Sequence, residues 1–316
     1  MLNDLLINAS KSATRTIPKD NPNPSESGRK ALPAPHRDSR LIRIGAGYDG
    51  LMVKRIRSLA LVVLVTWVLL VSSPVLSQSA VAVQYTEGVE RGFLVLRTLE
   101  GDILAQGDST QFARGDRVTN HTILRFKDGS INEETVVFSQ RRIFRLISDH
   151  QIQKGPAFKQ PMDVLVDGLT GQVTVHYTDN DGKEKTVTDR LKLPPNVCNG
   201  MVITLLKNIR PDVPLTTLSM VAAAPKPRLV KLLISPDGEE SVSAGGSSHK
   251  AMRYVVKVDI GGVAGVVAPI VGKQPQDTHV WIIGGDAPSF AKLEGPLYGS
   301  GPIWRMELTS PEWHDH

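Results

Sequence analysis

The chain after residue 83 is dominated by short runs of strand-forming residues separated by tight turn signals, and this alternation limits the fold more than any other feature. Val, Ile, Thr, Phe and Tyr are frequent in the runs, as they are in strands joined by hairpins. The turn signals are EGD at 100–102, KDGS at 127–130, TGQ at 170–172, DNDG at 179–182, SPDG at 235–238 and GGDAP at 284–288. We therefore expect a mainly β fold with roughly ten to twelve strands.

Several of these runs alternate apolar and polar residues. In the segment 173–178, Val173, Val175 and Tyr177 alternate with polar residues, and the segment 304–308 repeats the pattern. A period of two places the apolar side chains on one face of a strand and the polar ones on the other. The predicted sheet is therefore antiparallel, with one dry face and one wet face.

The segment 193–211, LPPNVCNGMVITLLKNIRP, has a different period. Asn196 suits a helix N-cap, Pro211 suits the stop beyond the end, and the apolar residues between them recur at helical spacing. We expect a helix of about 13 residues here, packed with its wide apolar face against the sheet. The predicted fold class is a curved antiparallel sheet, a half-barrel or open barrel, wrapped around one α-helix.

Residues 52–82 have the layout of a secretory signal. The basic residues Lys54, Arg55 and Arg57 precede an apolar stretch, and small residues follow it up to Ala82. The apolar stretch of about 13 residues is short for a membrane span, which needs about 20. We expect a signal peptide that is cleaved, and otherwise a hydrophobic signal helix retained as a transmembrane anchor.

Residues 1–51 are rich in Pro, Asn, Ser and charge, a composition that favours disorder. An ordinary signal begins near its own methionine, so translation from Met52 would make residues 1–51 a miscalled extension. Residues 83–316 form the predicted exported domain, which is periplasmic or in the cell envelope. Its membrane contact is expected only through the N-terminal segment, and it stays at the inner membrane if the signal is not cleaved.

The charge of the chain is concentrated in the N-terminal part. Residues 1–79 contain 11 of the 37 Lys and Arg but only 5 of the 32 Asp and Glu, which leaves 26 against 27 in the rest. Nucleic-acid binding needs clustered Lys and Arg, so this near-neutral remainder argues against it. Cys198 is the only cysteine, which excludes an internal disulfide and a thiolate metal cluster.

Two segments look irregular in the sequence. The segment 211–228 has a strand-like centre between prolines and is predicted to be an edge strand. The segment 237–250, DGEESVSAGGSSHK, is polar and rich in Gly and Ser, and we expect a mobile loop there.

The segment 260–277, IGGVAGVVAPIVGKQPQD, is apolar and rich in glycine. Its glycine spacing and Gln274 do not match a phosphate-binding loop, and it is too short for a membrane span. It fits a strand that continues from the alternating run at 254–260, bends, and returns with both faces apolar from Gly265 to Val271. Such a strand needs cover on both faces, which leaves open a filled core or a groove for an apolar ligand.

Residues with reactive side chains are scattered. His121, His150, His176 and His279 lie in different runs without the spacing of a metal site, and the chain has no G-x-S-x-G motif. Cys198 falls on the apolar face of the predicted helix, where a thiol stays protonated and inert. We therefore expect no catalytic residue, no metal site and no cofactor.

The segment Leu193–Val197 before the predicted helix, the strand VWII at 280–283 with its following turn, and the closing strand from Ile303 resemble a group of uncharacterised bacterial periplasmic proteins. These proteins look related to the lipoprotein-carrier half-barrels. The resemblance covers residues 90–310. It implies a curved antiparallel sheet that wraps a helix and can shelter acyl chains, and it supplies no catalytic residue.

Together these observations predict an exported, non-catalytic envelope protein that binds a hydrophobic, lipid-like ligand in a β half-barrel. Two alternatives remain: a structural or scaffold protein that contacts an envelope protein partner, and a hydrolase with dispersed carboxylates. For each candidate lining residue, filling the core is also an open interpretation. These candidates, chosen as large apolar side chains at predicted inward positions, are Phe126, Phe144, Phe158, Met201, Trp281 and Trp304.

Overall fold

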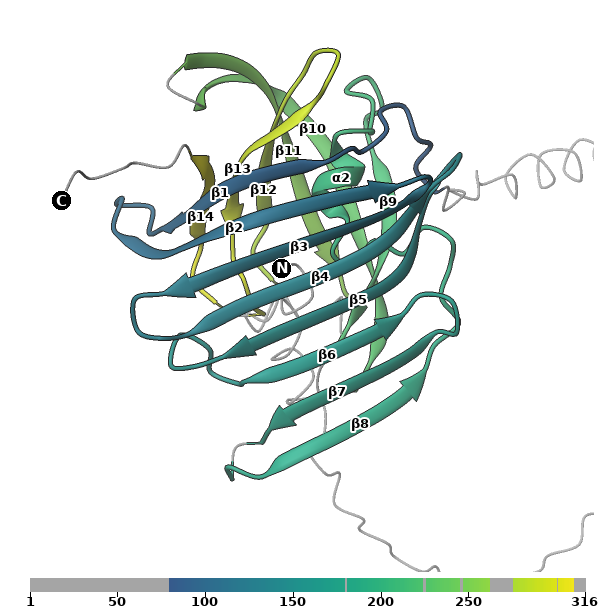
Figure 1. Cartoon of the computed structure of the whole chain (residues 1–316), viewed down its shortest axis with the longest axis vertical. Coiled ribbons are helices and arrows are strands. Elements are labelled where there is room, and N and C mark those ends of the chain that lie inside the picture. Colours follow the sequence, from purple (N-terminus) through teal and green to yellow (C-terminus); the bar gives the residue numbers. More distant parts are fainter. Residues whose placement is uncertain are drawn as a thin grey trace, which may run out of the picture. The chain divides into compact units, whose positions relative to one another are not determined.

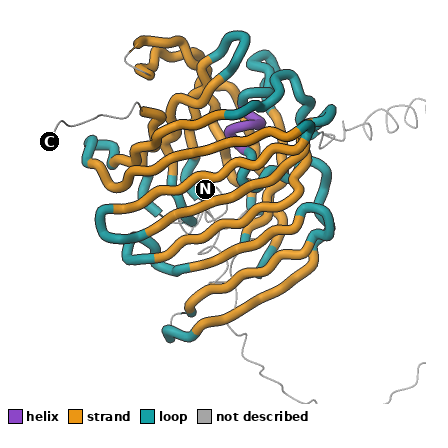
Figure 2. The backbone as a smooth tube through the Cα atoms, in the orientation of Figure 1, coloured by secondary structure: helices purple, strands orange, loops and turns teal. Residues whose placement is uncertain are grey.

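The computed structural model describes residues 80–179, 181–223, 226–244, 247–261, 275–299 and 301–309. In these residues 14 strands form one antiparallel sheet, and one short helix, α2 (Val202–Leu206), accompanies it (Figures 1 and 2). The strands are β1 (Glu90–Arg97), β2 (Ile103–Arg114), β3 (Arg117–Phe126), β4 (Ile131–Gln140), β5 (Phe144–Lys154), β6 (Met162–Asp167), β7 (Gln172–Thr178), β8 (Glu184–Arg190), β9 (Thr216–Ala222), β10 (Arg228–Ala244), β11 (Ser247–Asp259), β12 (Thr278–Ile283), β13 (Ser289–Gly295) and β14 (Trp304–Thr309). The expected mainly β fold is confirmed.

The sheet is a meander with one long-range junction. Its order is β8-β7-β6-β5-β4-β3-β2-β1-β14-β13-β12-β11-β10-β9, so nearly every strand pairs with its neighbour in sequence. The exception is β1, which pairs with the last strand, β14, in the register Leu94↔Leu308 and Leu96↔Met306. The two ends of the open sheet are β8 and β9, and it does not close into a barrel. The predicted open, curved antiparallel sheet is therefore confirmed, with more strands than expected.

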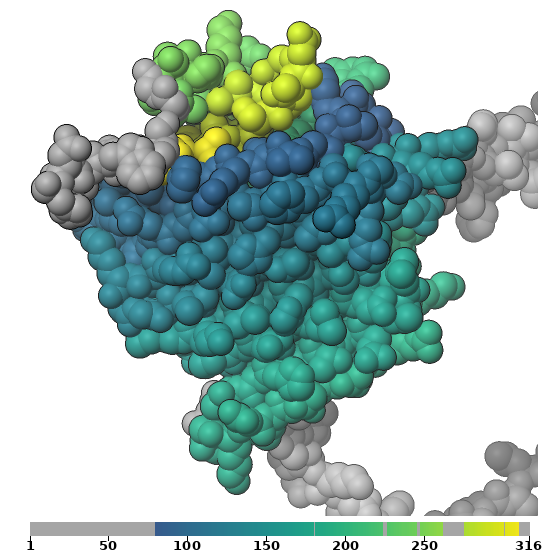
Figure 3. Space-filling model, viewed as in Figure 1, coloured from purple at the N-terminus to yellow at the C-terminus, as the bar shows by residue number. Residues whose placement is uncertain are grey.

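One face of the sheet, called the inner face, carries the core. Leu96, Leu124, Val164 and Val256 are fully buried there, at alternate positions of their strands. The residues Met201, Leu205 and Leu206, in and beside α2, belong to the same hydrophobic cluster. The sheet and the helix therefore bury their apolar surfaces against each other, as the sequence predicts. In the space-filling view (Figure 3), β2 to β7 present their other face, the outer face, as a continuous surface.

The helix is shorter than predicted and begins later. It spans five residues, Val202–Leu206, and Met201 precedes it without a side-chain cap. Asn196, the expected N-cap, instead donates from its side-chain amide to the carbonyl oxygen of Thr217 at 3.1 Å. Gly200 then takes a left-handed backbone conformation with φ of 67°, which is incompatible with a helix that continues from residue 196.

Residues 196–199 are used to cover the free edge of β9. Val197 forms a parallel bridge with Ser219. The Cys198 amide donates to the Ser219 carbonyl at 2.9 Å, and the Ser219 amide donates to the Asn196 carbonyl at 3.2 Å. An uncovered edge strand would leave its backbone donors and acceptors unpaired. The segment before α2 therefore pairs with β9. Because residues 196–199 take part in this pairing, the helix begins later than predicted.

The expected edge strand within 211–228 is confirmed, because β9 ends the sheet. The mobile loop expected at 237–250 is wrong. β10 and β11 continue as one long hairpin, paired from Glu239↔Met252 to Ala244↔Ser247 after a bulge that follows Pro236. Most side chains of this extension are exposed on both faces, so its polar sequence resembles a loop while backbone pairing keeps it extended.

The described part of the chain already contacts the sheet at its first residues. Ala82 forms a bridge with Ile143, and the Phe144 amide donates to the Val81 carbonyl at 3.0 Å. The extension 1–51 and most of the signal segment 52–82 lie outside the described residues, as does the return strand expected from Gly265 to Val271. Among the described helices, none has the length and hydropathy of a membrane span.

Candidate functional site

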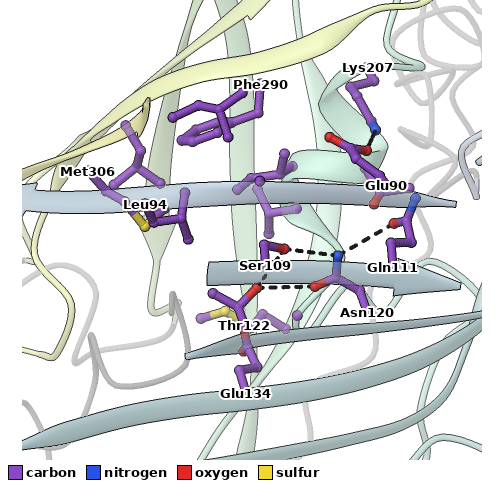
Figure 4. Close-up of a pocket in the computed structure, with 18 residues that line it drawn as sticks. Glu90, Leu94, Ser109, Gln111, Asn120, Thr122, Glu134, Lys207, Phe290 and Met306 are labelled. Atoms are coloured by element: carbon purple, nitrogen blue, oxygen red, sulfur yellow. Dashed lines mark hydrogen bonds and ion pairs between the residues drawn. The ribbon is translucent and has the colours of Figure 1, made fainter. Parts of the chain in front are cut away.

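A cavity of about 100 Å³ lies between the inner face of the sheet and α2. Its lining comes from β1–β4 on one side, from β9, β13 and β14 on the other, and from α2 and the residues beside it (Figure 4). The junction between β1 and β14 brings the first and last strands of the chain together at this place. The cavity therefore depends on the complete fold.

One side of the cavity is apolar. Leu94, Phe290 and Met306 point into it from β1, β13 and β14, and Figure 4 shows them grouped together. Gly92 leaves room for the Leu308 side chain, because a Cβ atom at residue 92 would lie 2.5 Å from Cδ1 of Leu308. The further apolar lining residues are Val202, Ile203, Met220, Leu293 and Leu308.

The adjoining side of the cavity is polar and comes from β2, β3 and β4. Ser109, Thr122 and Glu134 form one cross-strand row, since Ser109 is registered with Thr122 and Thr122 with Glu134. Asn120 lies beside this row and is registered with Gln111. Side chains of this wall are bonded to one another, as the dashed lines in Figure 4 show.

The hydrogen bonds of this wall can be rearranged. The Asn120 amide donates to Ser109 Oγ at 3.3 Å. The Thr122 hydroxyl lies 3.1 Å from Ser109 Oγ and 3.2 Å from Asn120 Oδ1, and its one proton serves one of them at a time. Because both hydroxyls rotate, the wall can close on itself or turn a donor and an acceptor toward a bound molecule.

Charged residues stand at the mouth of the cavity. Lys207, directly after α2, bonds through its ammonium to Glu87 at 2.7 Å and contacts Glu90 at 3.6 Å. Only 9% of the Lys207 side chain and 5% of the Glu87 side chain are exposed. Glu90 and Lys207 also line a surface depression formed with residues 84–89 and 286–288. The Glu90–Lys207 pair therefore separates the cavity from the outer solvent.

The polar row continues beyond the cavity. Gln151 on β5 is registered with Glu134 and is 0% exposed. Neither atom of its side-chain amide has a hydrogen-bond partner among the described residues, and the same is true of the Asn132 amide nitrogen. Buried polar groups of this kind are uncommon in proteins, because each costs free energy unless it is paired.

The six candidate residues from the sequence do not line this cavity. Phe126, Phe158 and Trp304 are brought together in the core with Tyr298, with ring centroids 5.4 Å apart for Phe126 and Phe158 and 5.7 Å apart for Phe126 and Trp304. Phe144 packs against Phe138 at 6.0 Å, and Met201 is 1% exposed in the same core.

Trp281 lies on the outer face, so its predicted inward position is wrong. It belongs to a separate small cluster with Val242, Ala251 and Ala291. Its indole nitrogen donates to Glu240 at 2.8 Å, and the Lys292 ammonium lies 4.0 Å from its ring centroid. Because Val280 and Ile282 fill the inner face of β12, the alternation of the strand turns Trp281 outward. The run VWII is apolar on both faces and could not reveal this.

The polar lining residues were missed because the sequence does not mark them as buried. On β2 and β3, inner positions such as Ser109 and Asn120 are as polar as their outer neighbours Thr110 and His121. A weak signal exists in the loss of apolar alternation at 107–111 and 119–122 within otherwise regular strands. Only the packing of α2 above these positions shows that they line a cavity.

The histidines of β3, β5 and β7 lie on the outer face, and each has one polar partner. His121 contacts Glu133 and His150 contacts Asp163, each at 2.8 Å, and His176 contacts the Thr186 hydroxyl at 2.8 Å. No group of three or more metal-ligating side chains occurs among the described residues. Cys198 is buried, and burial raises the pKa of its thiol far above the ordinary value.

Comparison with known proteins found no matching family model and no matching curated protein. A search of solved structures found a β-barrel-like protein of a domain of unknown function (DUF1849) from Brucella abortus, at 9% identity and a TM-score of 0.40. The match covers 72% of this chain and 98% of the other. It is too distant to carry an argument about function, and the resemblance to lipoprotein carriers stays a prediction.

Proposed function

We propose that this protein binds a single-chain, lipid-like amphiphile in the cavity between the sheet and α2, and that it does so without catalysis as an exported protein of the cell envelope. One observation carries the proposal: the cavity has an apolar wall around Leu94, Phe290 and Met306, which adjoins a hydrogen-bonding wall around Ser109, Asn120 and Thr122. An amphiphile matches both walls at once.

The size of the cavity limits the ligand. A cavity of about 100 Å³ holds several water molecules or a short stretch of alkyl chain, so a larger ligand enters it with only one part of the molecule. Each methylene group moved from water to the apolar wall contributes about 0.8 kcal/mol. A chain of several carbons therefore gains enough free energy to bind, while the polar wall orients its head.

The arrangement of the cavity favours binding over chemistry. Among the described lining residues there is no histidine, and the one ammonium, on Lys207, is held by carboxylates. The two lining carboxyl groups, Glu90 and Glu134, come from β1 and β4. The proposed export rests on the signal-like segment 52–82 of the sequence.

Native mass spectrometry of the protein purified from its own envelope fraction, without detergent, tests the proposal directly. We expect a bound amphiphile of low mass. Binding in the cavity is measured with N-phenyl-1-naphthylamine, an uncharged apolar probe whose fluorescence rises when it enters a dry site. Ile203→Trp fills the cavity from α2, where Ile203 is half-buried, and should reduce probe binding at least about tenfold.

Leu165→Trp is the matched control, because Leu165 is 46% exposed on the outer face of β6. It should leave binding unchanged. If the purified protein carries no amphiphile and the probe binds equally to both variants, the cavity is not a binding site. A pull-down from the envelope that then recovers one partner protein would support the scaffold alternative.

A further inference from the structure

We infer that the polar end of the ligand is a small uncharged group that both donates and accepts hydrogen bonds, such as a hydroxyl or a primary amide, and is not a carboxylate or phosphate. The inference rests on the proposed function and adds the chemistry of the head group. It follows from the hydrogen-bonding capacity of the polar groups in the wall and from the ion pairs that Lys207 already makes.

Apart from the Glu134 carboxylate, which accepts hydrogen bonds when ionised, the polar wall consists of groups that both donate and accept. Ser109 and Thr122 supply hydroxyls, and Asn120 and Gln111 supply amides. An anionic head only accepts hydrogen bonds and an ammonium only donates them, so either uses part of such a wall. A hydroxyl or amide uses both capacities, and the rotating hydroxyls of Ser109 and Thr122 adapt to it.

The one ammonium in the described lining is already neutralised. Lys207 bonds to Glu87 at 2.7 Å and contacts Glu90 at 3.6 Å. Gln111 also donates to the same Glu87 oxygen, at 2.8 Å. An anionic head would have to replace these carboxylates or lie beside them without a counterion. Moving an anion from water into such a site is costly.

The polar row beyond the cavity has the same character. Gln151 and Asn132 are 0% and 1% exposed, and their side-chain amides retain hydrogen-bonding atoms without partners among the described residues. These atoms lie next to Glu134 in the sheet, because Gln151 is registered with it and Asn132 precedes it by two residues on the same face. Neutral amides therefore extend the row beyond Glu134.

A series of ligands with one tail and different heads tests the inference. The purified full-length protein is titrated with 1-octanol, octanamide, octanoate, octyl phosphate and octylammonium, each displacing N-phenyl-1-naphthylamine. We expect octanol and octanamide to displace the probe at concentrations at least about tenfold lower than the charged members, as expected for about 1.4 kcal/mol. 1-Octanol, octyl phosphate and octylammonium share an eight-carbon tail, and octanamide and octanoate share a seven-carbon tail, so comparison within each set reports the head.

The double substitution Ser109→Ala with Thr122→Val removes both hydroxyls of the wall and keeps the shape of the strands. It should weaken octanol and octanamide about tenfold, as for the loss of one or two hydrogen bonds, and leave binding of the apolar probe unchanged. The control is Thr119→Val, at the outer face of β3, which should change neither.

The outcomes are separable. If octanoate, octyl phosphate or octylammonium binds as tightly as octanol, or if the double variant retains its affinity for octanol, the head-group inference is overturned while the proposed binding function stands. If no member of the series displaces the probe, or the probe does not bind, the proposed function itself fails.

Discussion

Residues 196–199 cover the edge of β9, and we therefore expect Asn199→Ala to lower the stability of the protein. The Asn199 side chain accepts a hydrogen bond from the Val221 amide at 2.8 Å and donates one to the Val221 carbonyl at 3.0 Å. Asn199 is 1% exposed and Val221 is 0% exposed. The substitution therefore leaves two buried backbone groups without these partners.

The magnitude follows from the desolvation of those two groups. Each buried group left unpaired costs about 1–3 kcal/mol. Relaxation of the edge recovers part of this, so we expect Asn199→Ala to lower the free energy of unfolding by about 2–4 kcal/mol. With a urea m-value of about 2–3 kcal/mol per M, the midpoint should fall by about 1 M.

Equilibrium urea denaturation followed by tryptophan fluorescence measures this change. Gln172→Ala, at an exposed position of β7, removes an amide without a buried partner and should change stability by less than about 0.5 kcal/mol. Hydrogen exchange supplies a local readout, because the Val221 amide should exchange faster in Asn199→Ala than in the control. A loss below about 0.5 kcal/mol, or an unchanged Val221 exchange rate, would refute the edge-cover argument.

Three further predictions concern Gly200, Cys198 and Tyr254. Gly200→Ala should cost about 2–4 kcal/mol, because φ is 67° there and a Cβ atom would lie 2.8 Å from Cβ of Val136. Gly182→Ala, with φ of 75° but open space around it, should cost only about 1 kcal/mol; equal losses in the two urea midpoints would contradict the packing argument. Burial raises the pKa of the Cys198 thiol, so Cys198 should resist iodoacetamide at pH 8 in the folded protein and react after unfolding. Mass spectrometry measures the labelling, and rapid labelling of the folded protein would contradict the burial of this thiol. Burial raises the pKa of Tyr254 to about 12 from the ordinary 10.0. The contribution of this shift to stability is therefore complete below pH 10 and is lost as the pH rises toward 12. An ultraviolet titration, compared with that of Tyr254→Phe, should show Tyr254 ionising well above pH 10, and ionisation near pH 10 would exclude the shift.

The sequence was sufficient for the class of the fold. Turn signals such as KDGS at 127–130 and DNDG at 179–182 lie between strands of the structure, and the alternation at 173–178 appears as β7. These features are local, since a hairpin is specified by its turn and by the period of its strands. The edge position of β9 could also be predicted, because prolines flank it.

The errors occurred where contacts from distant parts of the chain outweigh local preference. Asn196 has the residue type of an N-cap, yet its amide bonds to Thr217 because β9 has a free edge at that place. The polar hairpin at 237–250 stays extended because each strand supplies the backbone partners of the other. Trp281 turns outward because its neighbours on β12 fill the inner face. Local propensity contains none of this information.

The sequence by itself determined an antiparallel meander with a buried face and a short apolar helix, because period and turn chemistry act between residues close in the chain. The cavity was decided only by the tertiary structure. Its walls meet when β1 pairs with β14 and α2 is held by residues 84–90 and by β9, contacts that join distant segments. Polar residues such as Ser109 and Asn120 look solvent-facing in the sequence. Packing of the open sheet against the helix places them inside.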